Sequence, residues 1–105
     1  MISALAGFAL RSQTVPNEIY KVGQNTNRLL LATGELVIGW LLLRQAEIAI
    51  AALATNPTKT DRDFYTGKIA AARYFTANQL PRLATERAIL DATDDSLMQI
   101  PETAF

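Results

Sequence analysis

The stretch 36-LVIGWLLLRQAEIAIAALA-54 decides the fold of this 105-residue chain. Leucine, alanine and other helix-compatible residues fill it and no proline interrupts it, so the stretch predicts a helix. From Leu36 to Leu43 no residue is polar, whereas a helix that packs on one partner has a single apolar stripe. The segment is therefore either the centre of a helical bundle or a surface shared with another domain or subunit. We favour the second interpretation, because so short a chain has few neighbouring helices to cover this one.

The same stretch is the one candidate for a membrane span. Its uncharged apolar run is eight residues long and is followed at once by Arg44 and Glu47, whereas a helix needs about twenty apolar residues to cross a bilayer. We therefore predict no membrane span. Glycine is unfavourable in the interior of a helix. The usual reason for a glycine such as Gly39 at such a position is the close approach of another backbone.

Composition narrows the fold and excludes several kinds of chemistry. Half of the residues are hydrophobic, and only four prolines and five glycines interrupt a helix-forming composition, which predicts one small all-α domain. Ten basic and ten acidic residues give a net charge of zero, which argues against nucleic acid as a partner. Without cysteine or histidine, the chain has no disulfide, thiol nucleophile or histidine-based triad, and few routes to a metal site.

Turn-forming residues divide the rest of the chain. Thr14 can cap a helix that has Pro16 in its first turn, and the linker 55-TNPTKT-60 ends that helix. Pro81 removes a backbone donor and should kink the helix around it. The predicted helices cover residues 2–13, 16–54 and 61–92, followed by a short turn over 94–98. We predict one domain, residues 1–105: a small helical bundle built on two long antiparallel helices, the second kinked at Pro81, plus a short N-terminal helix.

The segment 64-FYTGKIAAARYF-75 contains a Gly-Lys pair that invites a nucleotide-site interpretation. A phosphate-binding loop needs a first glycine where this chain has Arg62 and a hydroxyl where it has Ile69, so this interpretation fails. Lys68 and Arg73 point about 140° apart around a helix and cannot share a ligand. On the helical projection one face is predicted to pack on the core: Tyr65, Ile69, Ala72, Thr76, Leu80 and Leu83. A second face, formed by Phe64, Lys68, Ala71 and Phe75, is available to a neighbour, with the stem of Lys68 packed on the rings.

The charged residues form no catalytic constellation. Glu35 and Glu47 are twelve residues apart on one helix and cannot share a proton, and acidic pairs elsewhere sit at helix starts. Arg44 needs a partner, for which Glu86 is one candidate among several. We predict no catalytic, cofactor-binding or metal-binding residue in this chain.

Four segments, taken together, resemble one protein family: 39-GWLLLRQAEIA-49, 64-FYTGKIAAARYF-75, 80-LPRLATERAI-89 and the ending 97-LM…AF-105. They are similar to the C-terminal accessory domain of the larger bacterial acyl-CoA dehydrogenases, the subgroup that includes enzymes similar to 3-methylmercaptopropionyl-CoA dehydrogenase. The resemblance covers residues 17–105.

The resemblance implies a cytoplasmic flavoenzyme as the parent protein. In such enzymes a carboxylate removes the α-proton of an acyl-CoA and FAD accepts the β-hydride, and both groups belong to a preceding dehydrogenase core. The resemblance implies that this chain is a C-terminal fragment of a longer enzyme, holds no cofactor itself and meets acyl-CoA only through its parent. It would pack on the dehydrogenase core and support assembly, and we expect a homo-oligomer when it is isolated. The alternative is a free-standing helical interaction module that homodimerises and has no redox role.

Overall fold

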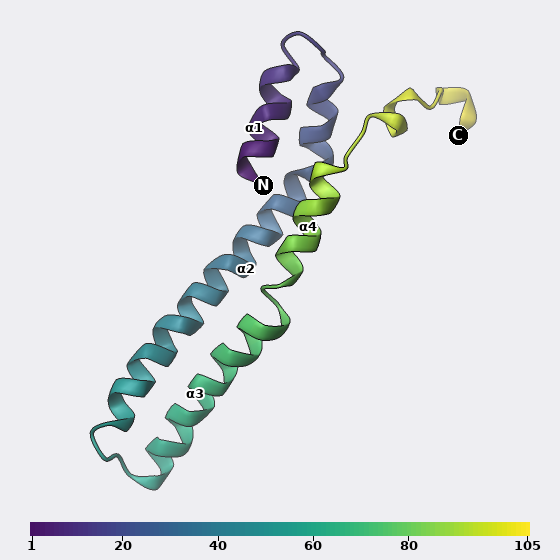
Figure 1. Ribbon diagram of the computed structural model, residues 1–105. Coiled ribbons are helices and arrows are strands. Elements are labelled where there is room, and N and C mark those ends of the chain that lie inside the picture. The colour runs from purple at the N-terminus through teal and green to yellow at the C-terminus, as the bar shows by residue number, and fades with distance from the viewer. The chain divides into compact units, whose positions relative to one another are not determined.

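The computed structural model describes all residues 1–105, and every regular element in it is helical (Figure 1). An all-α fold without strands is therefore confirmed. The elements are α1 (Ile2–Arg11), α2 (Glu18–Leu53), α3 (Lys59–Asn78) and α4 (Arg82–Asp91), followed by two 3₁₀ turns, η1 (Ser96–Gln99) and η2 (Glu102–Ala104). They form two compact units, one comprising Met1–Leu31 with Ala84–Phe105 and the other Ala32–Leu83.

The unit Ala32–Leu83 is a helical hairpin. The C-terminal part of α2 and all of α3 lie side by side and run in opposite directions (Figure 1). Asn56, with φ at 56°, reverses the chain after α2, and asparagine adopts this left-handed region more readily than most residues. The Thr58 hydroxyl then caps α3 by accepting a hydrogen bond of 3.2 Å from the Asp61 amide.

Small residues line the side of α2 that meets α3. They recur at spacings of three and seven, which keeps them on one face of a helix: Ala32, Gly39, Ala46 and Ala49 are all buried. On α3 the buried residue is Ala72, flanked by the half-buried Tyr65, Ile69 and Thr76. The predicted core face of α3 is confirmed. Because the seam is built from small side chains, the large apolar side chains of α2 point elsewhere.

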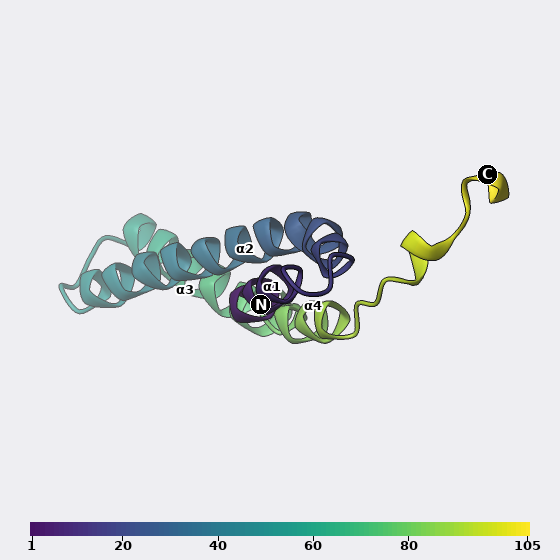
Figure 2. The same cartoon turned by 90° about the horizontal axis from the view of Figure 1, so that it is seen from above.

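The other unit has its own apolar core. Leu5 and Phe8 of α1 pack with Leu90 of α4, and Leu90 is fully buried. Four partly buried residues from the N-terminus, α1 and α2 complete the cluster: Met1, Ala4, Val22 and Leu29. Figure 2 shows α1 close to the first turns of α2 and to α4, as this cluster requires.

Two predicted boundaries are wrong. The helix predicted over 61–92 is two helices, because α3 ends at Asn78 and α4 begins at Arg82. Pro81 has no amide hydrogen, and the amides of Gln79 and Leu80 both bond to the Phe75 carbonyl, so the helix ends there and does not continue with a kink.

The second wrong boundary precedes α2. Thr14 donates its hydroxyl to the Arg11 carbonyl and does not cap α2, and Pro16 lies in the turn before the first helical residue, Glu18. The predicted end of α1 and start of α2 are thus each displaced by two residues, because local turn hydrogen bonds use the groups that capping would need.

Candidate docking surface

Six large side chains project from the middle of α2 into solvent. Their exposed fractions run from 46% to 61%, although core-type residues of this size are usually buried. We call this set the apolar face of α2: Leu36, Val37, Ile38, Trp40, Leu41 and Leu43. Contiguous apolar surface of this kind marks sites where another molecule or domain binds. Part of this helix is thus left exposed by its own chain, as the prediction of a surface shared with another domain or subunit requires.

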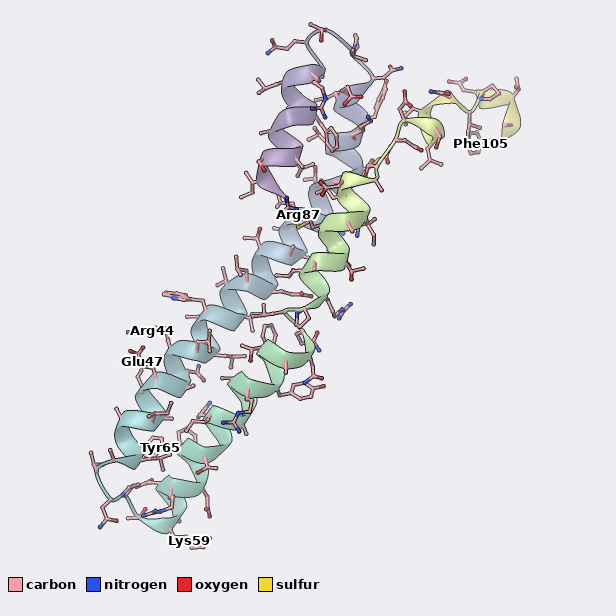
Figure 3. The ribbon with its side chains drawn as sticks, viewed as in Figure 1. Arg44, Glu47, Lys59, Tyr65, Arg87 and Phe105 are labelled. Carbon is pink, nitrogen blue, oxygen red and sulfur yellow. The ribbon has the colours of Figure 1, made fainter.

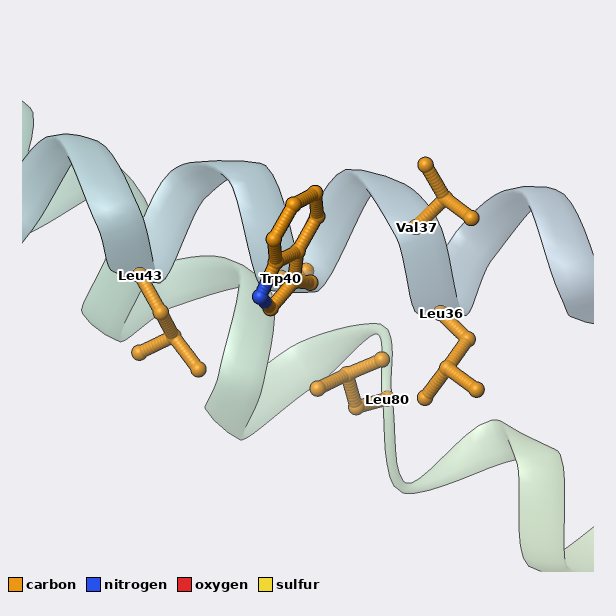
Figure 4. A pocket seen from close by; sticks show the side chains of 6 residues that line it. Leu36, Val37, Trp40, Leu43 and Leu80 are labelled. Atoms are coloured by element: carbon orange, nitrogen blue, oxygen red, sulfur yellow. The ribbon is translucent and has the colours of Figure 1, made fainter.

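Part of the apolar face is hollowed into a groove of about 440 Å³. The groove lies between α2 and the end of α3, and Figure 4 shows Leu36, Leu43 and Leu80 arranged around the Trp40 side chain. Its walls are hydrocarbon and indole, so it suits an apolar side chain better than a charged ligand.

Gly39 lines this groove. The feature that favours a glycine at this position differs from the backbone contact that was predicted. A Cβ at Gly39 would lie 3.2 Å from both δ-carbons of Leu80 and 3.4 Å from Phe75 Cε1. Side chains of α3 and of the turn that follows it, not a second backbone, therefore occupy the space beside the glycine. Leu80, assigned from sequence to the core face, is also the groove wall opposite Trp40.

The aromatic segment of α3 forms a second, smaller groove of about 180 Å³ against α2. Lys68 Nζ lies 5.2 Å from the centre of the Phe64 ring, and the Phe64 and Tyr65 rings meet edge to face at 5.6 Å. The predicted packing of Lys68 on Phe64 is confirmed, but Phe75 is directed to Gly39 and does not complete the pair. Arg73 is exposed, so the two cations do not meet on one ligand.

The ion pairs also differ from the prediction. Arg44 bonds to Glu47 at 2.8 Å, and Figure 3 shows both side chains on the side of α2 away from α3. Glu86 bonds instead to Arg28, within the other unit. Arg44 stays in solvent and takes the nearest carboxylate, so Glu86 is not its partner.

Sequence reasoning missed the buried polar residues of the unit formed by Met1–Leu31 and Ala84–Phe105. Asn25 is only 2% exposed and donates to the Lys21 carbonyl at 2.8 Å and to Thr93 Oγ1 at 3.0 Å. It also accepts from Arg28 Nε, and Arg28 in turn bonds to Glu86. A lone asparagine within a helical pattern gives no signal for this role, because its partner is 68 residues away in sequence.

Two carboxyl groups have lowered pKa values. Hydrogen bonding from Lys21 is the largest influence on Glu18 and lowers its pKa, burial acts in the opposite direction, and Arg11 lowers it further. The pKa of Asp94 is lowered by hydrogen bonds from the Ser96 hydroxyl and amide. Each carboxylate is held by its immediate neighbours, which is a structural arrangement and not that of a general base.

No group of three or more acidic, cysteine or histidine residues is close enough to hold a metal. Every buried side-chain nitrogen and oxygen has a hydrogen-bond partner within the chain. The most prominent surface feature is the apolar face of α2.

By length and hydropathy alone, one helix, α2, could cross a membrane. Its most apolar 18-residue window has a mean hydropathy of 1.7, and 17% of that window is buried. Central helices of water-soluble proteins meet the same criterion, so this property is weak evidence of a span.

Comparison with known proteins identifies the family of this chain. The model of a family described as acetyl-CoA dehydrogenase C-terminal like matches residues 2–101. The broad-specificity linear acyl-CoA dehydrogenase FadE5 of Mycobacterium tuberculosis is 42% identical over all 105 residues, which make up 17% of that enzyme. A butyryl-CoA dehydrogenase of Syntrophomonas wolfei is 35% identical over 79 residues, 74% of this chain and 13% of the enzyme. The chain thus spans less than a fifth of the length of these relatives, and it belongs to the acyl-CoA dehydrogenase C-terminal-like family.

Proposed function

We propose that this chain acts as the non-catalytic C-terminal domain of an FAD-dependent acyl-CoA dehydrogenase. The observation that carries the proposal is the family match over residues 2–101 of a chain whose main surface feature is the exposed apolar face of α2. A domain of this family would meet the rest of the enzyme through a surface of this kind. The finer assignment, to the subgroup similar to 3-methylmercaptopropionyl-CoA dehydrogenase, is part of the same proposal.

The parent reaction in this proposal is the oxidation of an acyl-CoA to a 2-enoyl-CoA. The names of the relatives, a broad-specificity linear acyl-CoA dehydrogenase and a butyryl-CoA dehydrogenase, support this reaction class. The base and the FAD would belong to the dehydrogenase core, so this chain takes no part in the chemical step. We place the enzyme in the cytoplasm, in keeping with such a metabolic role.

The role assigned to the chain is to stabilise the assembled enzyme. Burying a large apolar side chain contributes roughly 1.5–3 kcal/mol, so covering even part of the apolar face would hold the domain on its core. The same burial would remove from water a surface that otherwise promotes aggregation.

A chimeric enzyme tests this function. The 105-residue chain replaces the matched C-terminal segment of the mycobacterial relative, and the chimera is compared with the intact relative and with a core that lacks the segment. We expect the chimera to retain bound flavin and acyl-CoA-dependent reduction of an artificial electron acceptor. We expect the shortened core to lose stability or flavin. A shortened core as stable and active as the intact enzyme would contradict the role in assembly.

The apolar face also supports a second candidate function, a free-standing module that homodimerises. Sedimentation of the isolated chain distinguishes the two candidates when it is combined with the chimera. A well-defined dimer together with a chimera that fails to fold would favour the module. A chimera that folds would favour the C-terminal domain, whatever the mass of the isolated chain.

A further inference from the structure

The apolar face of α2 is too wide for one contact. At 100° per residue its members follow one another around the helix in the order Leu43, Leu36, Trp40, Val37, Leu41 and Ile38, an arc of about 220° from first to last. All six side chains are between 46% and 61% exposed, so the whole arc is open.

The hairpin itself uses the remainder of the circumference. Gly39 is buried against Leu80 and Phe75, and Leu42 beside it is half-buried. Both residues project between Ile38 and Leu36 on the side that the arc leaves free. Because α3 already occupies that side, the open arc must be covered by something outside the hairpin.

A helix that packs on one layer needs an apolar stripe about 100° wide. The open arc is about twice that width, so one flat partner surface would leave half of it in water. In a dimer with two-fold symmetry each copy presents the same single patch to the other. Such a dimer would cover either the side of Leu36 or the side of Ile38, but not both.

We propose that the segment Leu36–Leu43 is held in an apolar cleft of the dehydrogenase core, contacted from at least two directions by that one partner. This inference rests on the proposed function and adds the shape of the partner surface: a cleft between apolar elements, into which the outer side of α2 inserts. The groove beside Trp40, of about 440 Å³, would receive side chains from one wall of the cleft.

Lipid is a poorer occupant than protein for this segment. Its eight residues extend about 12 Å along the helix axis, against the roughly 30 Å of a bilayer interior. Glu35 precedes the segment, and the ion pair of Arg44 with Glu47 follows it, both side chains of that pair being more than half exposed. A protein cleft can end where these charges begin.

Single cysteines test the two sides separately, because the chain has no cysteine of its own. Leu36→Cys and Ile38→Cys place a thiol at or near either end of the arc, and Thr60→Cys is the control in the exposed, charged first turn of α3. Each variant is made in the isolated chain and in the chimera with the mycobacterial core. Maleimide labelling is timed and located by peptide mass spectrometry, and flavin content is recorded for each chimera.

We expect both arc thiols to react about tenfold or more slowly in the flavin-loaded chimera than in the isolated chain, because buried groups react only when the structure opens. The Thr60→Cys rate should change little. Protection of only one arc thiol in a flavin-loaded chimera would overturn the cleft while leaving the proposed function intact. A chimera that binds no flavin would contradict both.

Two outcomes would assign the arc to another occupant. Protection of both thiols in the isolated chain would mean that further copies of the chain surround α2. Protection of the two arc thiols only after vesicles of phosphatidylcholine and phosphatidylglycerol are added would mean that lipid covers the arc. Either result overturns the core as the partner.

Discussion

The contact between Gly39 and α3 allows a sharp test of how the hairpin packs. Replacing glycine by alanine inside a helix normally stabilises it by up to about 1 kcal/mol. At Gly39 the new methyl group would lie 3.2 Å from two carbons of Leu80, closer than ordinary van der Waals contact, and 3.4 Å from Phe75, so the Leu80 side chain would have to move by a few tenths of an ångström. Overpacking of this kind typically costs about 1–3 kcal/mol, which cancels or exceeds the helical gain.

Gly34 is the matched control for this substitution. It lies in the same helix, five residues earlier, and a Cβ there would meet nothing within 4 Å. We expect Gly34→Ala to raise the free energy of unfolding by about 0.5–1 kcal/mol. Gly39→Ala should leave it unchanged or lower it, so that the two variants differ by about 1 kcal/mol or more.

Urea unfolding of the 105-residue chain measures this difference. Circular dichroism follows the helices, and Trp40 fluorescence, from the chain's one tryptophan, reports on the hairpin next to the substitution. With a slope of about 1–3 kcal/mol per molar urea, the difference corresponds to about 0.3–1 M between the two midpoints. Equal gains in both variants, with unchanged slopes, would refute the close contact of Leu80 with Gly39.

Three further predictions concern the other unit. Leu90→Ala should lower the free energy of unfolding by about 2–5 kcal/mol, because Leu90 is fully buried at the centre of the α1–α2–α4 core; urea unfolding measures this. Asn25→Ala should destabilise by about 1–3 kcal/mol, and in a double-mutant cycle with Thr93→Ala the two effects should not add, because the side chains share one hydrogen bond. The pKa of Glu18 lies below its ordinary value of 4.5, chiefly because Lys21 donates to it, so the ionised form stabilises the fold above that value. Its contribution should be lost as the pH falls through the lowered pKa, seen as a falling urea midpoint between about pH 6 and about pH 3.

Controls separate these effects from general loss of stability. Ile89→Ala, beside Leu90 but 46% exposed, should change stability much less than Leu90→Ala, and a similar loss would contradict the described core. Additive effects of the Asn25 and Thr93 substitutions would show that their hydrogen bond contributes nothing. Glu18→Gln should flatten part of the acid dependence, and an unchanged pH profile would remove Glu18 as its source.

Local patterns predicted the helices well, because propensity and apolar periodicity act within a few turns. The long helix ending near residue 54 and the core face containing Ala72 follow from such patterns, whereas α3 begins at Lys59, two residues earlier than predicted and within the linker at 55–60. Pro81 was correctly chosen as an interruption. Whether a proline kinks a helix or ends it depends on which carbonyls the neighbouring amides can reach, and here Gln79 and Leu80 both turn back to Phe75.

Contacts distant in sequence could not be predicted in the same way. Asn25 pairs with Thr93 and Arg28 with Glu86 across more than 50 residues, and nothing in their local sequence marks either partner. Glu86, one of several candidate partners for Arg44, was not its partner for this reason, since helix periodicity identifies a face but not the residue opposite it.

Some features of the docking surface could likewise be predicted from the sequence, and others could not. Composition and periodicity were enough to predict an all-α chain with a helical segment apolar on all sides, because these properties follow from side-chain chemistry and the helical repeat alone. Only the packed hairpin decided which side α3 covers, how Leu80 and Trp40 form a groove, and which arc stays open to solvent. Those features depend on which face of α2 meets α3, and that is set by the small residues of the seam and the side chains that meet them across the hairpin.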